Sequence, residues 1–524
     1  MGGFVKRFRV FAAVAMATVS FGVLAGSATA SVAGITAQKQ VSERLLELTV
    51  DTPAFTEPTK VHVFLPTGYD ADTARRWPVT YALAGMQNRY SSFANVLDGV
   101  NMTKDFPSIV VSPDGKSGYW SDWFNGGAGG APEYETYVID QLIPLIDATF
   151  RTIPDRAHRA VLGISMGGYG AMMLAAHHPD LFGSAASISG AVDSNNPAIG
   201  AALSLGSTFD GGAIDAINGP RLSEEVRWHG NNPTDIAANL RGMDLQVRTA
   251  NGTLNPSIGE GASPADSLSC LVEGGVYAGS ISFHDQLDSL GIDHLWKDYG
   301  NGCHTKQNFT REVADTLLAF AQNFAHPVAG PQTFRYESIK PEFDIWGWNV
   351  KADPDRAAEF MSIESGGDAL TLTGTGNTAV TSPALYKGLK KVDVNGSPVR
   401  PDADGRLHFT VDLGEAHAVQ QYTIDADENF VTRQVTFKPQ ALITILKAKP
   451  FRRGVRVCAK ATGGVISKAK VKVGKRTVKV KLAAKKVCRN VRVKAKKKPK
   501  KITIRGRDAY GHTVSASARV KRGG

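Results

Sequence analysis

One stretch of the chain decides its fold, and it reads AVLGISMGGYGAMMLAA over residues 160–176. Its apolar start is typical of a buried strand, and the small and apolar residues after Ser165 are typical of a buried helix. Gly163 and Gly167 flank Ser165, two residues away on either side. A G-x-S-x-G pattern between a strand and a helix marks a turn so sharp that it lifts the serine hydroxyl above the sheet. The stretch therefore predicts Ser165 as a nucleophile that a histidine can deprotonate.

The five-residue pattern is weak when it is taken alone. The chain has 54 glycines among 524 residues, and the pattern then arises by chance on the order of a few tenths of a time per chain. A strand-to-helix turn without chemistry is an alternative that these residues leave open. The surrounding elements decide between the two, together with an acid and then a histidine further along the chain.

Residues 31–326 alternate short β-rich runs with helical patterns, as in a mostly parallel sheet covered by helices. Helical periodicity is clearest over residues 137–150 and 313–320. This alternation predicts an α/β-hydrolase domain with eight strands, and a cap at residues 194–243 that shapes the acyl site. The predicted strands are residues 45–50, 61–65, 79–83, 109–111, 160–164, 184–188, 245–250 and 295–299.

The N-terminal residues predict export. Residues 1–30 combine early basic residues, an apolar stretch and an Ala-Thr-Ala end, which is typical of a cleaved secretory signal peptide. No other run approaches the roughly 18 apolar residues of a spanning helix, so we expect an exported protein that is not transmembrane.

Export favours disulfides among the four cysteines, because the compartment is oxidising. Pairing within each part of the chain gives Cys270–Cys303 and Cys458–Cys488, one of three connectivities that the sequence allows.

The base is predicted at His304, in the glycine-rich loop of residues 300–304 directly after the last predicted strand. The mature chain has other histidines, but those named below do not follow that strand directly. His177 and His178 precede Pro179 near a helix end, where a capping or surface role is expected. His158, His284 and His294 also lie outside the loop that follows the last predicted strand.

The acid is expected after the strand at residues 245–250, where spacing alone does not choose among several carboxylates. A Cys270–Cys303 disulfide would bring Glu273 beside His304, within reach to orient the imidazole, so Glu273 is favoured. Asp266 is the second choice. The full set of candidates is Glu260, Asp266, Glu273, Asp285 and Asp288.

Two backbone amides are needed to bind the negative charge that develops on a substrate oxygen. The residue after the nucleophile and a residue of the loop after the third strand supply them in this fold. Those residues are Met166 and Met86, and only their amides are involved.

The pattern changes at about residue 331, where strands continue without helices and predict a β-sandwich over residues 331–440, with its last strand at residues 422–424. Asn395-Gly396 and Asp404-Gly405 are expected to form hairpin turns. Trp346 and Trp348 lie in a predicted strand at residues 345–350 and would share one face. That arrangement suits either a carbohydrate-binding surface or a hydrophobic core, and we favour a place in the hydrophobic core.

Charge is distributed very unevenly in this chain of formal charge +11. Residues 441–524 hold 28 of the 60 Lys and Arg residues but one of the 49 acidic residues. Cationic and apolar residues alternate there at period two, so a third, basic β-domain is predicted with one packed face and one charged face. Lys496–Lys501 resembles a nuclear or nucleic-acid signal, but export argues against nucleic acid. We expect retention on an anionic cell envelope, the alternative being a merely soluble charged domain.

The chain resembles the antigen 85 mycolyltransferases and related secreted esterases of actinobacteria, within the α/β-hydrolase superfamily. The resemblance covers about residues 35–326. It rests on segments in the family order: YWSDWF at 119–124, ET at 135–136, GISMG at 163–167, AMMLAAHHP at 171–179, NPT at 232–234 and NGT at 251–253.

The resemblance implies Ser165 as nucleophile, Glu273 as acid and His304 as base, with Met86 and Met166 as oxyanion amides. It implies an acyl-serine intermediate that is passed to water or a carbohydrate hydroxyl, with an acyl ester or lipid as donor. No cofactor and no metal ligand are expected.

Two departures from the family put trehalose specificity in doubt. Ala84 and Gln87 stand where the mycolyltransferases have an acidic residue and an arginine, and residues 305–309 lack the usual aromatic-rich sequence. A general esterase therefore fits as well. The alternative from another class is a catalytically silent envelope- or matrix-binding protein on the same fold.

Overall fold

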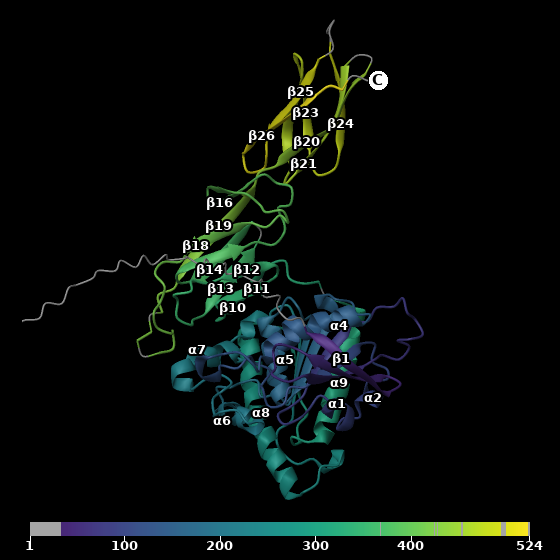
Figure 1. Cartoon of the computed structure of the whole chain (residues 1–524), viewed down its shortest axis with the longest axis vertical. Helices are drawn as coiled ribbons and strands as arrows, with labels where there is room; N and C mark the ends of the chain where they lie inside the picture. The colour runs from purple at the N-terminus through teal and green to yellow at the C-terminus, as the bar shows by residue number, and fades with distance from the viewer. Residues whose placement is uncertain are drawn as a thin grey trace, which may run out of the picture.

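The computed structural model describes residues 33–327, 329–366, 368–423, 425–426, 428–451, 454–493 and 499–521. The predicted signal peptide at residues 1–30 lies outside them, as do Lys496, Lys497 and Lys498. In Figure 1 the helices gather in one layered body, and two β-only bodies follow it toward the C-terminus.

The first body is built on a nine-stranded sheet of order β1-β2-β3-β5-β4-β6-β7-β8-β9. The five pairs from β5–β4 to β8–β9 are parallel and the other three are antiparallel. The predicted α/β-hydrolase architecture is confirmed, with nine strands in place of eight. The strands are β1 (Gly34–Ser42), β2 (Leu45–Asp51), β3 (Thr59–Phe64), β4 (Val79–Leu83), β5 (Ile109–Pro113), β6 (Arg159–Ile164), β7 (Ser184–Ile188), β8 (Asp244–Thr249) and β9 (Leu295–Asp298).

The additional strand is β1, which forms one edge of the sheet and pairs with β2 alone. Its side chains from residue 36 to residue 42 are all exposed. An edge strand that buries neither face has no alternation of apolar and polar residues, so the sequence pattern did not reveal it.

Helices cover both faces of the sheet, and successive strand residues enter opposite cores. Val161 packs into the core under α5 and α8, whereas Ala160 and Leu162 pack into the core under α1 and α9. The helices are α1 (Ser92–Asn95), α2 (Gly99–Met102), α3 (Tyr134–Thr136), α4 (Ile143–Thr149), α5 (Met166–His177), α6 (Pro197–Gly206), α7 (Arg221–Asn231), α8 (Pro264–Ser289) and α9 (Lys306–Ala325), with a π-helical turn at Tyr137–Leu142 and short 3-10 turns at Asn125–Gly127, Arg156–His158, Ser207–Asp210, Ala237–Leu240 and Pro256–Ile258.

The second body is a pair of antiparallel sheets, ordered β10-β13-β14-β19-β16-β17 and β11-β12-β15-β18. Its buried residues, from Tyr336 to Phe437, form a core of their own. The strands are β10 (Phe334–Ser338), β11 (Glu342–Ile345), β12 (Trp348–Lys351), β13 (Met361–Gly366), β14 (Ala369–Gly374), β15 (Asn377–Thr381), β16 (Val392–Val394), β17 (Ser397–Val399), β18 (His408–Asp412) and β19 (Val431–Pro439).

The strand predicted at residues 345–350 is wrong, because the chain reverses within it. Trp346 and Gly347 both have positive φ and join β11 to β12 as a hairpin. Trp348 is buried in the core, as we favoured, but Trp346 lies in the turn and does not share its strand.

Two smaller predictions in this body also change. Asn395-Gly396 does form a hairpin turn between β16 and β17, whereas the turn at Gly405 joins no pair of hydrogen-bonded strands. Tyr422 and Thr423, predicted in a strand, lie in a turn, and Ile424 is outside the described residues.

The third body has a separate core and lies farthest from the helices in Figure 1. Along β22 the predicted alternation holds: Ala469, Val471 and Val473 are buried while the lysines between them are exposed. Its strands are β20 (Leu442–Phe451), β21 (Gly454–Thr462), β22 (Ile466–Val473), β23 (Arg476–Leu482), β24 (Val487–Arg492), β25 (Lys501–Arg507) and β26 (Thr513–Arg519).

Both predicted disulfides are present, Cys270–Cys303 in the first body and Cys458–Cys488 between β21 and β24. Among the described residues, no helix combines the length and apolar character that a membrane crossing needs.

The second body is fixed to the first by a buried ion-pair cluster. Lys340 Nζ lies 2.6 Å from Glu135 Oε1, which His177 Nδ1 and His178 Nε2 also contact at 3.0 and 2.7 Å. Burial opposes ionisation of Glu135, but Lys340 and the two imidazoles outweigh it and hold the pKa of this carboxyl well below its usual range. His177 is therefore buried in a contact between bodies and does not have the expected surface role.

Candidate active site

The turn at Ser165 has a backbone conformation that few residues adopt. Ser165 has φ 59° and ψ −120° and stands between β6 and α5. A Cβ on Gly163 would lie 1.9 Å from the carbonyl oxygen of Gly167, and one on Gly167 would lie 2.1 Å from that of Leu83. Both glycines are thus required sterically, and a strained serine of this kind is a common mark of function.

The chain after β4 passes directly beside this turn. A Cβ on Gly85 would lie 3.3 Å from the Cβ of Ser165, and Met86 is the next residue. Trp120 Nε1 donates to the carbonyl oxygen of Ala84 at 3.3 Å, which holds this segment in place. Met166 is buried and is the first residue of α5. The two residues predicted to supply amides therefore lie on the two segments that meet at Ser165.

His304 and Glu273 form a direct pair. The Nδ1 atom of His304 lies 2.7 Å from Oε2 of Glu273, whose side chain is fully buried, while the imidazole is 13% exposed. The other carboxylate oxygen of Glu273 accepts from the amide of Ala250 at 3.0 Å and from the hydroxyl of Ser189 at 2.7 Å. Such a bond to Nδ1 fixes the imidazole and leaves Nε2 to exchange a proton.

Ser165 and this pair are connected through the end of β7. The amide of Ser165 donates to the carbonyl oxygen of Ile188 at 2.9 Å. The next residue, Ser189, has φ 43° and directs its hydroxyl to Glu273. One strand end thus positions both the predicted nucleophile and the predicted acid.

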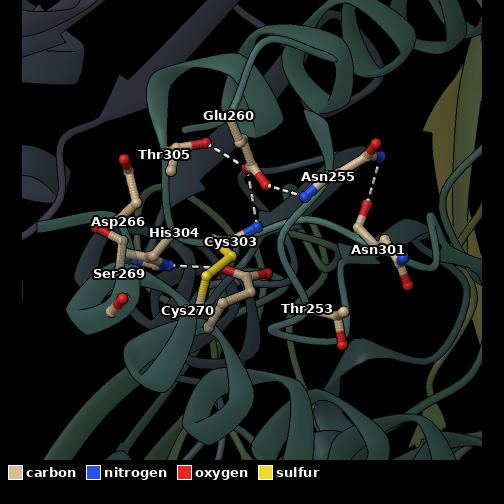
Figure 2. Close-up of a disulfide and its surroundings, with 12 residues drawn as sticks. Thr253, Asn255, Glu260, Asp266, Ser269, Cys270, Asn301, Cys303, His304 and Thr305 are labelled. Atoms are coloured by element: carbon tan, nitrogen blue, oxygen red, sulfur yellow. Dashed lines mark hydrogen bonds and ion pairs between the residues drawn. A yellow bond between two sulfur atoms is a disulfide. The ribbon is translucent and has the colours of Figure 1, made fainter. Parts of the chain in front are cut away.

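The disulfide and Glu260 hold the loop that carries His304 (Figure 2). Cys270 is on α8, three residues before Glu273, and is bonded to Cys303, the residue before His304. Glu260 is buried and accepts from the amide of Cys303 at 2.9 Å and from the hydroxyl of Thr305 at 2.7 Å. Its second oxygen accepts from the amide of Asn255 at 2.8 Å.

A second carboxyl group, that of Glu312 on α9, lies behind the pair and was not predicted. Its Oε2 atom is 3.1 Å from Oγ of Ser189, and Asn308 Nδ2 donates to its Oε1 atom at 3.0 Å. Burial, and then the nearby charge of Glu273, raise the pKa of Glu312 well above its usual range. The helical periodicity of this segment indicated only an apolar face, so no local signal distinguished Glu312.

The other predicted acid candidates have different surroundings. Asp266 caps the start of its own helix: its carboxylate accepts from the amide and hydroxyl of Ser263. Asp285 and Asp288 are on the C-terminal half of α8, and Asp288 lies near His284 and His294. His158 contacts Asp155. In the described part of the chain, Glu273 is the carboxylate at hydrogen-bond distance from the imidazole of His304.

An apolar pocket of about 60 Å³ adjoins the turn. Ala84, Gly85 and Ile164 line it on the side of Ser165, and Phe309 lines it on the side of His304, whose ring centroid is 4.8 Å from that of Phe309. Ala84 thus adds an apolar wall to this pocket.

A strained serine between a buried strand and a helix, with a carboxylate–imidazole pair formed by α8 and the loop after β9, defines the α/β-hydrolase class. Within that class, the family described as "Putative esterase" matches residues 52–318, and the chain belongs to this family.

Curated relatives include Esterase Rv1288 of Mycobacterium tuberculosis (strain ATCC 25618 / H37Rv), 30% identical in an alignment of 267 residues that covers 49% of this chain and 55% of the relative. The diacylglycerol acyltransferase/mycolyltransferase Ag85A of Mycobacterium leprae (strain TN) is 28% identical over 40% of this chain and 63% of its own length. The chain thus spans just over half the length of the first of these relatives. A solved structure of MPT51 of Mycobacterium tuberculosis has a TM-score of 0.44 at 22% identity, covering 53% of this chain and 97% of that one.

Proposed function

We propose that this chain is a serine esterase or acyltransferase with Ser165 as nucleophile, His304 as general base and Glu273 as the acid that orients it. The observation that carries the proposal is the 2.7 Å contact between His304 Nδ1 and the buried carboxylate of Glu273. A buried carboxylate that binds an imidazole on one side and donors on the other keeps one tautomer of the base and stabilises its protonated form.

The reaction follows from these positions in two halves. His304 takes the proton of the Ser165 hydroxyl as its oxygen attacks the ester carbonyl, and it returns that proton to the leaving alcohol. The acyl group is then on Ser165. In the second half, His304 removes a proton from water or from an acceptor hydroxyl, whose oxygen attacks the acyl-serine and releases Ser165.

The amides of Met86 and Met166 would bind the oxyanion in both halves. Support comes from their positions on the two segments that meet at Ser165, with Met166 at the N-terminus of α5. Helix N-termini favour negative charge, and backbone donors fixed by buried segments need no reorganisation during the reaction.

The donor is proposed to be an acyl ester or a lipid, and the acceptor water or a carbohydrate hydroxyl. An Ala84 side chain in the apolar pocket supports an ester with apolar groups and removes one polar partner for a sugar. One relative bears the name diacylglycerol acyltransferase/mycolyltransferase, which supports testing acyl transfer to a hydroxyl acceptor as well as hydrolysis.

Export and retention at the cell envelope complete the proposal. The exposed lysines Lys468, Lys470 and Lys472 form one face of β22 and would be attracted to an anionic surface, with less attraction at high salt. Deletion of residues 441–524 should release the exported protein from the wall, and Gln at those three lysines should weaken binding without disturbing the core. Wall association that survives the deletion would contradict this part of the proposal.

Labelling by a serine-directed fluorophosphonate tests the enzyme proposal against a silent binding protein. We expect labelling of the wild type and of a Ser223→Ala control, whose serine is exposed on α7, and no labelling of Ser165→Ala. An unlabelled folded wild type, or equal labelling of Ser165→Ala, would overturn the proposal. A panel of acyl donors and acceptors with product analysis then separates hydrolysis from transfer.

A further inference from the structure

A second cluster of chemically active side chains lies on the C-terminal half of α8, outside the proposed active site. His284 and Asp288 stand one turn apart on this helix, and His294 follows the turn at Gly291 that leads into β9. One ligand atom from each of the three side chains lies within 4.8 Å of the others.

Backbone contacts and packing already orient both imidazoles. The Nδ1 atom of His294 lies 2.9 Å from the carbonyl oxygen of Ile292, so Nδ1 carries the proton and Nε2 is the acceptor. That Nε2 lies 2.7 Å from Nδ1 of His284. The ring of His284 is stacked on Trp296 with centroids 4.6 Å apart and planes within 2°. Both rings are held by contacts of the kind that fix metal-binding histidines.

We propose that His284, His294 and Asp288 bind a divalent transition-metal ion, with Zn²⁺ as the probe that best fits two imidazoles and a carboxylate. Imidazole and carboxylate ligands suit zinc, which takes three protein ligands and leaves a fourth position to water.

The geometry needs a small adjustment that the surroundings allow. Two ligands of one tetrahedral zinc stand about 3.3 Å apart, so the two nitrogens must separate slightly. The proton on Nδ1 of His284 moves to Nε2 of the same ring, and Nδ1 becomes the ligand without net loss of a proton. Asp288 Oδ2 is 3.8 Å from that Nε2, and its side chain, 65% exposed, is able to turn toward the ion.

Access and charge also suit a cation. His294 lines a cavity of about 570 Å³, and the side chain of Asp288 is 65% exposed, so the cluster is accessible from solvent. Arg241, the cation next to this turn, has its guanidinium directed to the carbonyl oxygens of Leu290 and Gly291. Asp285 and Asp293 add negative charge to the neighbouring positions of the sequence.

A metal here would join α8, which carries Glu273, to β9, which leads to the loop of His304. The role of this ion would be structural: it would link α8 to the segment before β9, at the end of α8 opposite the Cys270–Cys303 disulfide. Its loss should lower the melting temperature without removing a group that takes part in acyl transfer.

The test is calorimetric titration of Zn²⁺ into the full, untagged chain after treatment with a chelator. We expect one saturable site whose affinity falls at least tenfold in His294→Ala and in His284→Gln, the latter chosen to keep the packing on Trp296. His408→Ala should bind like the wild type, because His408 is exposed in the second body, where it contacts Asp402 and Thr381. Zinc should raise the melting temperature of the wild type and of His408→Ala. It should leave that of His294→Ala and His284→Gln unchanged.

Histidine footprinting of the wild type with diethyl pyrocarbonate gives a readout that does not depend on the variants folding. Zinc should protect His284 and His294 and leave the modification of His158 unchanged. Absence of saturable binding, equal binding by the two site variants, or protection confined to His304 would each overturn the assignment.

Discussion

Glu273 and Glu312 meet at one hydroxyl group: Oγ of Ser189 lies 2.7 Å from Oε1 of Glu273 and 3.1 Å from Oε2 of Glu312. Both side chains are fully buried. Two carboxyl groups this close do not both ionise, and the raised pKa of Glu312 makes it the protonated member. Glu312 then donates to Ser189, and Ser189 donates to the side chain of Glu273 that faces His304.

Glu312→Gln should keep most of the activity, because an amide N–H replaces the carboxyl O–H as donor to Ser189. Glu312→Ala should lower kcat/KM by roughly tenfold, the cost of one lost hydrogen bond in the network. The two rates, measured on one ester substrate across pH, check this chain of donors. Equal activity of the two variants would contradict it.

Glu312 also gives a pH dependence of stability with a defined sign. Its pKa is raised in the folded protein, so the folded state binds the proton more tightly, and the wild type loses stability as pH rises from the ordinary glutamate range toward the raised value. Glu312→Gln lacks this loss, which amounts to at most about 1.4 kcal/mol per pH unit. Urea unfolding at several pH values should therefore show that the stability of the variant increases relative to that of the wild type as pH rises. A difference that is constant with pH would argue against a protonated Glu312.

Glu273→Gln should lower kcat by about 10³- to 10⁴-fold, because the imidazole loses the carboxylate that sets its tautomer and stabilises its charge. Asp266→Asn is the matched control on the same helix and should leave kcat unchanged, since Asp266 caps the helix at an exposed site. A large loss in the control would reopen the choice of the acid.

The two disulfides provide a matched pair, with sequence separations of 33 and 30 residues. Removal of either by paired Cys→Ala changes should cost about 3–4 kcal/mol in the stability of its own body. Only the loss of Cys270–Cys303 should also lower kcat, because Cys303 precedes His304. Ester hydrolysis and thermal unfolding, measured side by side, separate the two effects.

Lys340→Met should loosen the contact between the first two bodies, because it leaves the buried carboxylate of Glu135 without its cation. The side chain of Lys340 is 35% exposed, so solvent screening brings the loss below the roughly 3–5 kcal/mol that breaking a fully buried pair costs. We expect faster proteolysis between residues 326 and 334, and partial recovery in a Glu135→Gln/Lys340→Met double variant. Unchanged proteolysis in the single variant would mean that the other contacts suffice.

Much of the fold was predictable because its signals are local. A few consecutive residues are enough to indicate the glycine turn around Ser165, each buried parallel strand and the alternating lysines of β22. The exposed edge strand β1 and the hairpin at Trp346 were not predictable in this way. The first buries no face, and the second reverses within an apolar run that resembles a single strand.

The candidate site was predictable in part. Ser165 and His304 each stand at a recognisable position of the fold, and the resemblance supported Glu273. The same segment offered five carboxylates, and nothing local ranked Glu260 as the residue that holds the loop or identified Glu312 and Ser189 as the groups behind Glu273.

The sequence by itself determined the order of the buried strands of the first body, the sharp turn at Ser165 and the basic character of residues 441–524, because backbone sterics, side-chain periodicity and charge act between near neighbours. Only the tertiary structure decided which carboxylate meets His304, which one stays protonated behind it, and which histidines meet between α8 and the turn before β9. Those contacts join residues tens to more than a hundred positions apart, and packing of the whole sheet brings them within hydrogen-bond distance.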